Sequence, residues 1–283
     1  MKKGCLILGV SLSLLLQSCS ASGPDNGIKV ISRVTLPAQL DESSGLFCPD
    51  AGVLYSLNDS GNTPELFSLN PQGNIVKADT ITARNKDWES VTGDAQALYI
   101  GDIGNNNGKR KTIQVQVLDK TNLTAPPLRK LIVSYQDNPI DENFYLAHDY
   151  DAEALVSAGE KLVLFSKSWK SGIAHVYELS KTQPKQTVVA VAHIEGLPGI
   201  VTGGDYDAKH GVFILVGYKV SHLIGLTPFI AKVDRQYRLL SSYELDGFAQ
   251  VEGVCVAPDS RIWISQEGSF FQGQSLANID LPN

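Results

Sequence analysis

A unit of about 50 residues recurs along the chain, and this repetition limits the possible folds more than any other feature. Each unit begins with an acid or a hydroxyl residue, which is followed by a short hydrophobic strand, a turn and a second strand with a polar end. The starting residues are separated by 45, 64, 52 and 47 positions and are Ser44, Glu89, Glu153, Asp205 and Glu252. Because each interval also contains two further strand-like runs, the repeat has the four strands of a β-propeller blade.

The sequence therefore predicts an all-β fold, a five-bladed β-propeller. From residue 28 onward, short β-rich runs alternate with clusters of Gly, Asn, Asp and Pro, and helical periodicity is almost absent. The fifth unit has only three runs, so we expect KVISRVTL (29–36) near the N-terminus to close the ring as its fourth strand. In the third blade, TVVAVAHI (187–194) is the expected fourth strand. Six blades are the alternative, which requires residues 138–150 to conceal an extra blade.

The N-terminus predicts export and lipid attachment. Two lysines precede an apolar stretch (4–16) that is short for a membrane span, as in a signal peptide. The segment Leu16-Gln-Ser-Cys19 resembles a bacterial lipobox, which implies acylation of Cys19 and a membrane anchor. We expect a signal peptide at 1–18, the lipidated Cys19 with a tether at 19–27, and one propeller domain at 28–283. Ser20 favours an outer-membrane lipoprotein that faces the periplasm.

Charge and cysteine content narrow the partners. The net charge of −6 with no Lys/Arg run argues against nucleic acid, and a monomer is expected. In an oxidising compartment Cys48 and Cys255 can form a disulfide, although two buried thiols are the preferred interpretation.

The repeating acids predict a cation site in the central channel. The first strand of each propeller blade lines the channel, so these acids would face one another, which is costly unless they are protonated or neutralised. Oxygen ligands in a wide cage favour Ca²⁺ over Mg²⁺. The expected ligands are Ser44, Glu89, Glu153, Asp205 and Glu252. In the alternative, these side chains cap neighbouring strands without a metal.

Further polar residues are expected at the channel mouth, where the second strands end. The candidates for ligand contact are Asn58, Asp59, Asp102, Asn105, Arg110, Tyr218 and Glu267. If the protein is an enzyme, Glu153 or Asp87 would activate water, and Lys167 or Arg110 would stabilise phosphoryl charge. Lys167 is alternatively a counter-ion for the channel acids.

Three strings carry a family resemblance: LYSLNDSGNTPELFSLNPQG (54–73), DWESV with LYIGDIGNN (87–106), and DYDAEAL (149–155). They resemble the bacterial propeller group of SdiA-regulated periplasmic proteins and esterase-like phytase domains. A more distant similarity is to the calcium-activated nucleotidases, or apyrases, which implies five blades and an axial Ca²⁺. Their ligand pattern is similar to Ser44, Glu89, Glu153 and Glu252-Gly253. In the fourth blade Asp205 or Thr202 must replace a Ser.

Other motifs are weaker. The loop 102–108 lacks the Gly and the distal Glu of an EF-hand, so a turn is favoured over a second calcium site. The five histidines are expected in different blades without ligand spacing, which disfavours zinc chemistry.

The leading prediction is a Ca²⁺-binding module for a small phosphorylated ligand or an envelope protein. The alternatives are a calcium-dependent phosphoester or phosphoanhydride hydrolase and an envelope scaffold.

Overall fold

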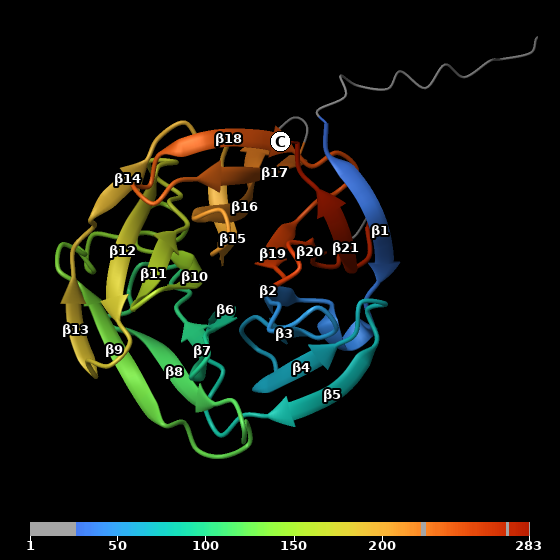
Figure 1. The fold of residues 1–283 in the computed structure, drawn as a ribbon. Coiled ribbons are helices and arrows are strands. Elements are labelled where there is room, and N and C mark those ends of the chain that lie inside the picture. Colours follow the sequence, from blue (N-terminus) through green and yellow to red (C-terminus); the bar gives the residue numbers. More distant parts are fainter. Residues whose placement is uncertain (1–26, 222–224, 270–271, 283) are drawn as a thin grey trace, which may run out of the picture.

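The structure is a computed structural model that describes residues 27–221, 225–269 and 272–282. The described residues form five β-sheets arranged as blades around a central channel (Figure 1). The inner strands of successive blades contact one another around the whole ring. The predicted five-bladed propeller is therefore confirmed. The predicted signal peptide, Cys19 and most of the tether lie outside the described residues.

The strands of each blade follow from the channel outward. Blade one contains β2 (Ser43–Phe47), β3 (Leu54–Asn58), β4 (Glu65–Leu69) and β5 (Ile75–Thr80), preceded by the 3₁₀ turn η1 (Ala38–Leu40). Blade two contains β6 (Trp88–Gly93), β7 (Ala97–Asp102), β8 (Ile113–Asp119) and β9 (Arg129–Tyr135). Blade three contains β10 (Ala152–Ala158), β11 (Lys161–Ser166), β12 (Ala174–Ser180) and β14 (Ala192–Ile194). Blade four contains β15 (Ile200–Asp207), β16 (Val212–Ser221), β17 (Gly225–Val233) and β18 (Leu239–Glu244). Blade five contains β19 (Val251–Val256), β20 (Ile262–Gln266), β21 (Ser275–Asp280) and β1 (Lys29–Thr35).

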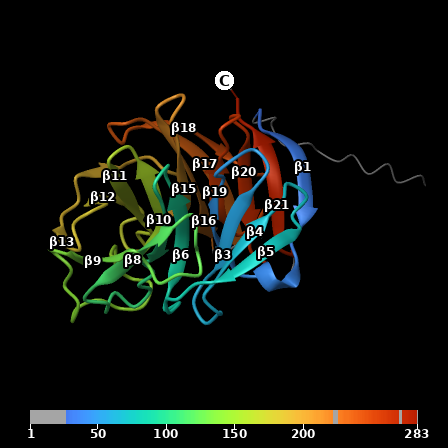
Figure 2. The ribbon, with the colours of Figure 1, turned by 60° about the horizontal axis from the view of Figure 1, so that its bottom comes forward.

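The N-terminal strand closes the ring, as the sequence predicts. Strand β1 pairs antiparallel with β21 as the outermost strand of blade five (Figure 2). The Arg33 guanidinium of β1 donates hydrogen bonds to Ser275 Oγ (3.1 Å) and Gln266 Oε1 (3.2 Å). The first and last described strands thus belong to one sheet, which leaves no open edge between them.

One strand prediction was wrong. The run 187–194 does not form a single fourth strand of blade three. Instead β13 (Lys185–Val188) pairs parallel with β9 as a fifth strand of blade two, and only β14 pairs with β12. The outer edge of β9 has free backbone groups that β13 satisfies, so the apolar run divides between two blades. The segment 136–151, between β9 and β10, contains no strand, in agreement with five blades rather than six.

The hydrophobic core consists of five clusters, and each cluster fills the space between two successive blades. Because inner and middle strands have a neighbouring blade on each face, they read as nearly continuous apolar runs. Strand β7, for example, is buried along its whole length. This packing fixes the inner strands, whose first residues surround the channel.

Candidate functional site

Each inner strand begins with a β-bulge, and the five bulges occupy equivalent positions. In every blade the pairing of the first and second strands skips one residue near its start. The skipped residues are Ser44, Glu89, Glu153, Thr202 and Glu252, and all five are buried. A bulge redirects the side chain of its extra residue, so the backbone places one polar group per blade at the same level. We refer to these five residues as the bulge ring.

The bulge ring corrects the expected role of Asp205. The skipped residue of blade four is Thr202, and Asp205 lies three positions further along β15, where it pairs regularly with Ile214. Its carboxylate accepts hydrogen bonds from the backbone N–H groups of Tyr206 and Val256, both 2.8 Å. Burial raises the pKa of Asp205 to about 7. Asp205 therefore ties blade four to blade five and is not the counterpart of the other four residues.

A sequence signal for Thr202 existed. The residue after each bulge is small: Gly45, Ser90, Ala154, Gly203 and Gly253. A Cβ on Gly45 would lie 2.7 Å from the backbone nitrogen of Val91 in the next blade, so the close approach of inner strands excludes larger residues there. Asp205 is followed by Tyr206, which breaks this rule.

The two hydroxyl residues of the bulge ring each bond to the inner strand of the next blade. The Ser44 hydroxyl lies 3.1 Å from both the backbone oxygen and Oε2 of Glu89. The Thr202 hydroxyl donates to the backbone oxygen of Val251 at 2.6 Å. These contacts also support part of the capping alternative, since hydroxyls of the ring do satisfy inner-strand carbonyls.

The main cation within the ring is Lys167, which follows β11. Its Nζ lies 3.1 Å from Glu153 Oε1, and both side chains are buried. The same ammonium lies 5.2 Å from the centre of the Trp169 ring and 5.6 Å from that of Tyr218. Burial favours the neutral amine, but the surrounding carboxylates outweigh it and raise the pKa of Lys167. Glu153 and Lys167 are thus paired with each other, as the counter-ion interpretation expects.

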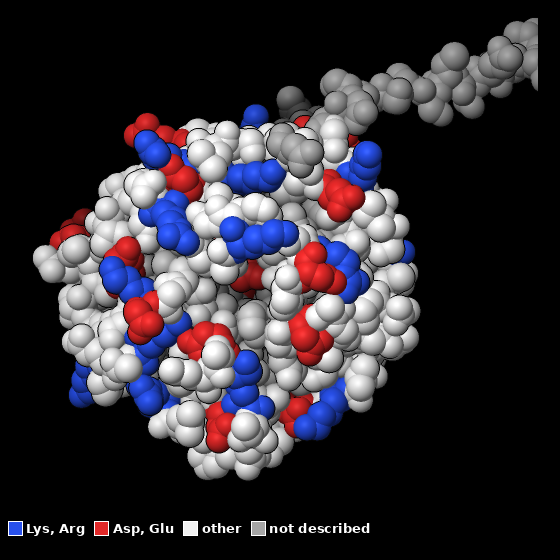
Figure 3. All heavy atoms as spheres, in the orientation of Figure 1, with Lys and Arg blue, Asp and Glu red and all other residues white. Residues whose placement is uncertain are grey.

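A compact group of carboxylates lies beside the ring. Asp59 follows β3, Asp87 precedes β6, and Glu89 is the bulge residue of β6; one oxygen from each lies within 4.8 Å of the others. Gly104 makes room for them, because a Cβ at this position would lie 2.6 Å from the Asp87 carboxylate. Figure 3 shows acidic atoms recessed in the central opening. One residue expected at the mouth, Asp59, and one expected base, Asp87, therefore form a cluster with the ring acid Glu89.

Burial and mutual repulsion make these acids hard to ionise. The pKa of Glu89 is raised by burial and by Glu153, and that of Glu153 by burial in spite of Lys167. Burial together with Glu252 raises the pKa of Glu267 to about 9, and burial with Asp59 raises that of Asp87 to about 6.

Glu252 adds an unsatisfied acceptor to this end of the channel. Burial raises its pKa, although Lys167 and hydrogen bonds from Gln250 and Tyr218 oppose the shift. Its Oε2 atom is buried and has no hydrogen-bond partner among the described residues. A buried carboxylate oxygen without a partner is unusual in a native fold and marks a place for a proton, a water or a cation.

Four other predicted mouth residues, Asp102, Arg110, Asn105 and Asn58, make contacts within the protein. Arg110 pairs with Asp102 at 2.6 Å, and its Nη1 lies 3.9 Å from Asp87. Asn105 receives the Arg110 backbone N–H and donates its side-chain amide to the backbone oxygen of Tyr150. Asn58 donates to the backbone oxygen of Gln39. Loop 102–108 closes with a turn from Asn105 to Gly108, as favoured above.

A basic cavity of about 590 Å³ adjoins the carboxylates. Arg110 and three exposed lysines line it, together with Asp87, the asparagines of the loop and Tyr145. The lysines are Lys86, Lys109 and Lys111. The cavity offers cationic groups beside Asp87, whose carboxylate also belongs to the cluster with Asp59 and Glu89.

Comparisons with known proteins identify the fold. The PQQ-bound form of an aldose sugar dehydrogenase from Streptomyces coelicolor aligns with a TM-score of 0.50 and 9% identity, over 89% of this chain and 97% of that chain. A putative oxidoreductase (glucose dehydrogenase) from Thermus thermophilus aligns with a TM-score of 0.47 and 10% identity, over 89% and 99%. No family model and no curated protein sequence matches the chain. At 9% identity the first of these alignments shows the fold alone, which is β-propeller-like, and function must be argued from the site.

Proposed function

We propose that the channel binds Ca²⁺ through Asp59, Asp87 and Glu89, and that the protein is a ligand-binding module built around this ion. The supporting observation is that oxygens from these three acids lie within 4.8 Å of one another. Calcium–oxygen distances of about 2.3–2.6 Å allow two ligands of one ion to be up to about 5 Å apart. The donor set contains only oxygens, as a hard cation prefers.

The balance of charge in the channel favours a bound cation over neutralisation of the acids by protein side chains alone. Acids crowd together here and act on one another electrostatically, namely Glu42, Asp59, Asp87, Glu89, Asp151, Glu153, Glu252 and Glu267. Lys167 and Arg110 are cations that act on these acids, and each is already paired with an acid. A divalent ion would neutralise two charges at the place where Glu89 and Asp87 resist ionisation. The resemblance to SdiA-regulated and esterase-like phytase propellers is in line with this proposal.

Calorimetric titration of the full chain with Ca²⁺ tests the proposal. We expect saturable binding at one site, and we expect Glu89→Gln to weaken it at least about tenfold because the site loses a charged ligand. Glu65→Gln, which removes an acid from the middle of blade one, is the matched control and should leave the affinity unchanged. Equal affinity in Glu89→Gln and the intact chain would contradict the proposal.

A second function, phosphoester hydrolysis, is favoured by the basic cavity beside Asp87. Three exposed lysines would hold phosphate oxygens, and Asp87, with its pKa raised to about 6, would accept a proton from an attacking water. Glu153 and Lys167 would then contribute their charges to the site from within the channel. Incubation with nucleotides, phytate and phosphodiesters, with and without Ca²⁺, should show turnover that Asp87→Asn lowers at least about 100-fold. Asp259→Asn, which replaces an exposed acid, is the control. If Ca²⁺ binds but no turnover occurs, the hydrolysis proposal is rejected and the Ca²⁺-binding proposal is unaffected.

We infer that the propeller is anchored to the outer membrane from the periplasmic side through a lipidated Cys19. The lipobox resemblance supports this inference. Among the described residues, no helix is long and apolar enough to cross a membrane. Mass spectrometry of the mature chain should find an acylated Cys19 as its first residue, whereas an unmodified residue there would overturn the inference.

A further inference from the structure

Two histidines that are 18 positions apart in the sequence face each other on neighbouring strands of blade three. In the antiparallel pair β12–β14, His175 lies directly opposite His193. The centres of the two imidazole rings are 4.5 Å apart, and the rings are nearly perpendicular. The expectation that the histidines lie in different blades was wrong for this pair. It failed because β14, which contains His193, pairs with β12, which contains His175, in one sheet.

The pair borders a cavity of about 250 Å³ at the outer boundary between blades two and three. Three tyrosines line it with the histidines: Tyr135, Tyr150 and Tyr177. The cavity exists where residues 189–191 cross from β13 in blade two to β14 in blade three, so neither sheet fills the space. It is separate from the basic cavity near Asp87, with which it shares no lining residue.

Two features of the cavity indicate that a polar ligand belongs there. The Tyr135 hydroxyl is buried and has no hydrogen-bond partner among the described residues, although buried hydroxyls normally find one. The Tyr177 hydroxyl lies 3.5 Å from Nδ1 of His175, which adds a weak oxygen donor beside the imidazole. A small hydrated ion could satisfy the Tyr135 hydroxyl through one of its water ligands.

The environment of His175 suits it to metal binding. Burial, followed by the neighbouring His193, lowers the pKa of His175, while Asp149 opposes this shift. His175 is therefore neutral at neutral pH and has a lone pair for coordination. Neutral imidazole is the commonest metal ligand in proteins, and it suits copper, nickel and zinc.

We propose that His175 and His193 chelate a divalent ion of the copper, nickel and zinc group at the boundary between blades two and three. Directly opposed residues on antiparallel strands have Cβ atoms about 4.5–5.5 Å apart, which lets two imidazoles reach one ion after a small ring rotation. Water molecules complete the coordination, and the Tyr177 hydroxyl lies beside the His175 ligand. The nitrogen donors make this site chemically distinct from the oxygen cluster in the channel, and it does not depend on the channel binding Ca²⁺.

Titration of the full chain, without a histidine tag and in saturating Ca²⁺, with Cu²⁺ and Zn²⁺ tests the site. We expect His193→Ala and His175→Ala each to weaken binding at least about tenfold, since even outer-shell changes at metal sites often cost this much. His210→Ala is the matched control, because His210 is exposed and pairs with Asp207 in blade four. The Cu²⁺ electron paramagnetic resonance spectrum should show coupling to two nitrogens, and one of these couplings should disappear in His193→Ala.

His193 is exposed, so its replacement should leave the fold intact, as a circular dichroism spectrum will check. Equal affinities in His193→Ala and the intact chain would overturn the proposal, as would a spectrum with oxygen ligands only. Binding that is lost in His210→Ala instead would place the ion in blade four and would likewise reject the proposed site.

Discussion

At the scale of single residues, the channel is governed by acids whose pKa values burial raises. Glu89, Glu153 and Glu252 each occupy a bulge position with at most 3% of their surface exposed. Such a carboxylate must hold a proton, pair with a base or contact a cation. Glu153 pairs with Lys167, but Glu252 Oε2 has no partner among the described residues. The residue identities thus create a demand for positive charge that one lysine does not meet.

Because the channel acids lack enough positive charge, we predict that the free energy of unfolding falls as pH rises when no divalent cation is present. The pKa of Glu267 is raised to about 9 from an ordinary value of 4.5, and that of Asp87 to about 6 from 3.8. Between the unfolded and folded pKa values the folded state holds more protons, so the free energy of unfolding decreases with pH. Each such group contributes at most about 1.4 kcal/mol per pH unit.

Urea denaturation at pH 5 to 9 in EDTA checks this prediction. We expect the free energy of unfolding to decrease over this window, and we expect Ca²⁺ to restore most of the loss by replacing the protons. A free energy of unfolding that rises with pH in EDTA would contradict the inferred protonation of the channel acids.

At the scale of elements, the bulges decide which residues meet in the channel. Period and composition predict the strands correctly apart from the one expected at 187–194, and four of the five ring members follow from the sequence. Thr202 required the rule that a small residue follows each bulge, as Gly203 does. The rule is physical, because neighbouring inner strands approach so closely that a Cβ on Gly45 would lie 2.7 Å from Val91 N.

A different cause explains the misplaced strand. The apolar run 187–194 has the length and composition of one strand, but its two ends hydrogen-bond to different sheets. Local pattern cannot report this, since the outer edges of β9 and β12 compete for the same segment. The crossing between them produces the cavity beside His175 and His193.

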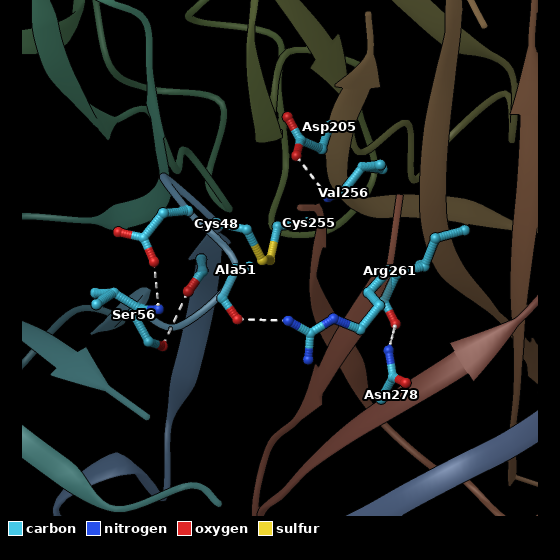
Figure 4. Close-up of a disulfide and its surroundings, with 12 residues drawn as sticks. Cys48, Ala51, Ser56, Asp205, Cys255, Val256, Arg261 and Asn278 are labelled. Atoms are coloured by element: carbon cyan, nitrogen blue, oxygen red, sulfur yellow. Dashed lines mark hydrogen bonds between the residues drawn. A yellow bond between two sulfur atoms is a disulfide. The ribbon is translucent and has the colours of Figure 1, made fainter. Parts of the chain in front are cut away.

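At the scale of the whole molecule, the ring is closed three times between blade five and blade one. Strand β1 completes blade five, and Arg261 Nη2 donates to the backbone oxygen of Ala51 at 2.5 Å. A disulfide joins Cys48 after β2 to Cys255 in β19, with their Cα atoms 5.6 Å apart (Figure 4). The preference for two buried thiols was therefore wrong.

The disulfide is predicted to stabilise the propeller strongly because it closes a loop with a sequence separation of 207 residues. Restriction of the unfolded chain by such a crosslink contributes about 2–5 kcal/mol. The double substitution Cys48→Ala with Cys255→Ala should lower the free energy of unfolding by this amount in chemical denaturation. Reductant should destabilise the intact chain and leave the double variant unaffected; destabilisation of both by reductant would contradict this explanation.

The sequence by itself determined the fold class, the closing strand and the acidic character of the channel, and it favoured five blades over six, because strand period and repeat length are local properties. Only the tertiary structure decided which side chains share a site. Asp59, Asp87 and Glu89 meet because the end of one blade's second strand lies beside the start of the next blade. Likewise, the thiols of Cys48 and Cys255 meet only because the ring closes. Contacts between distant segments depend on register and on the approach of neighbouring blades, which no local pattern records.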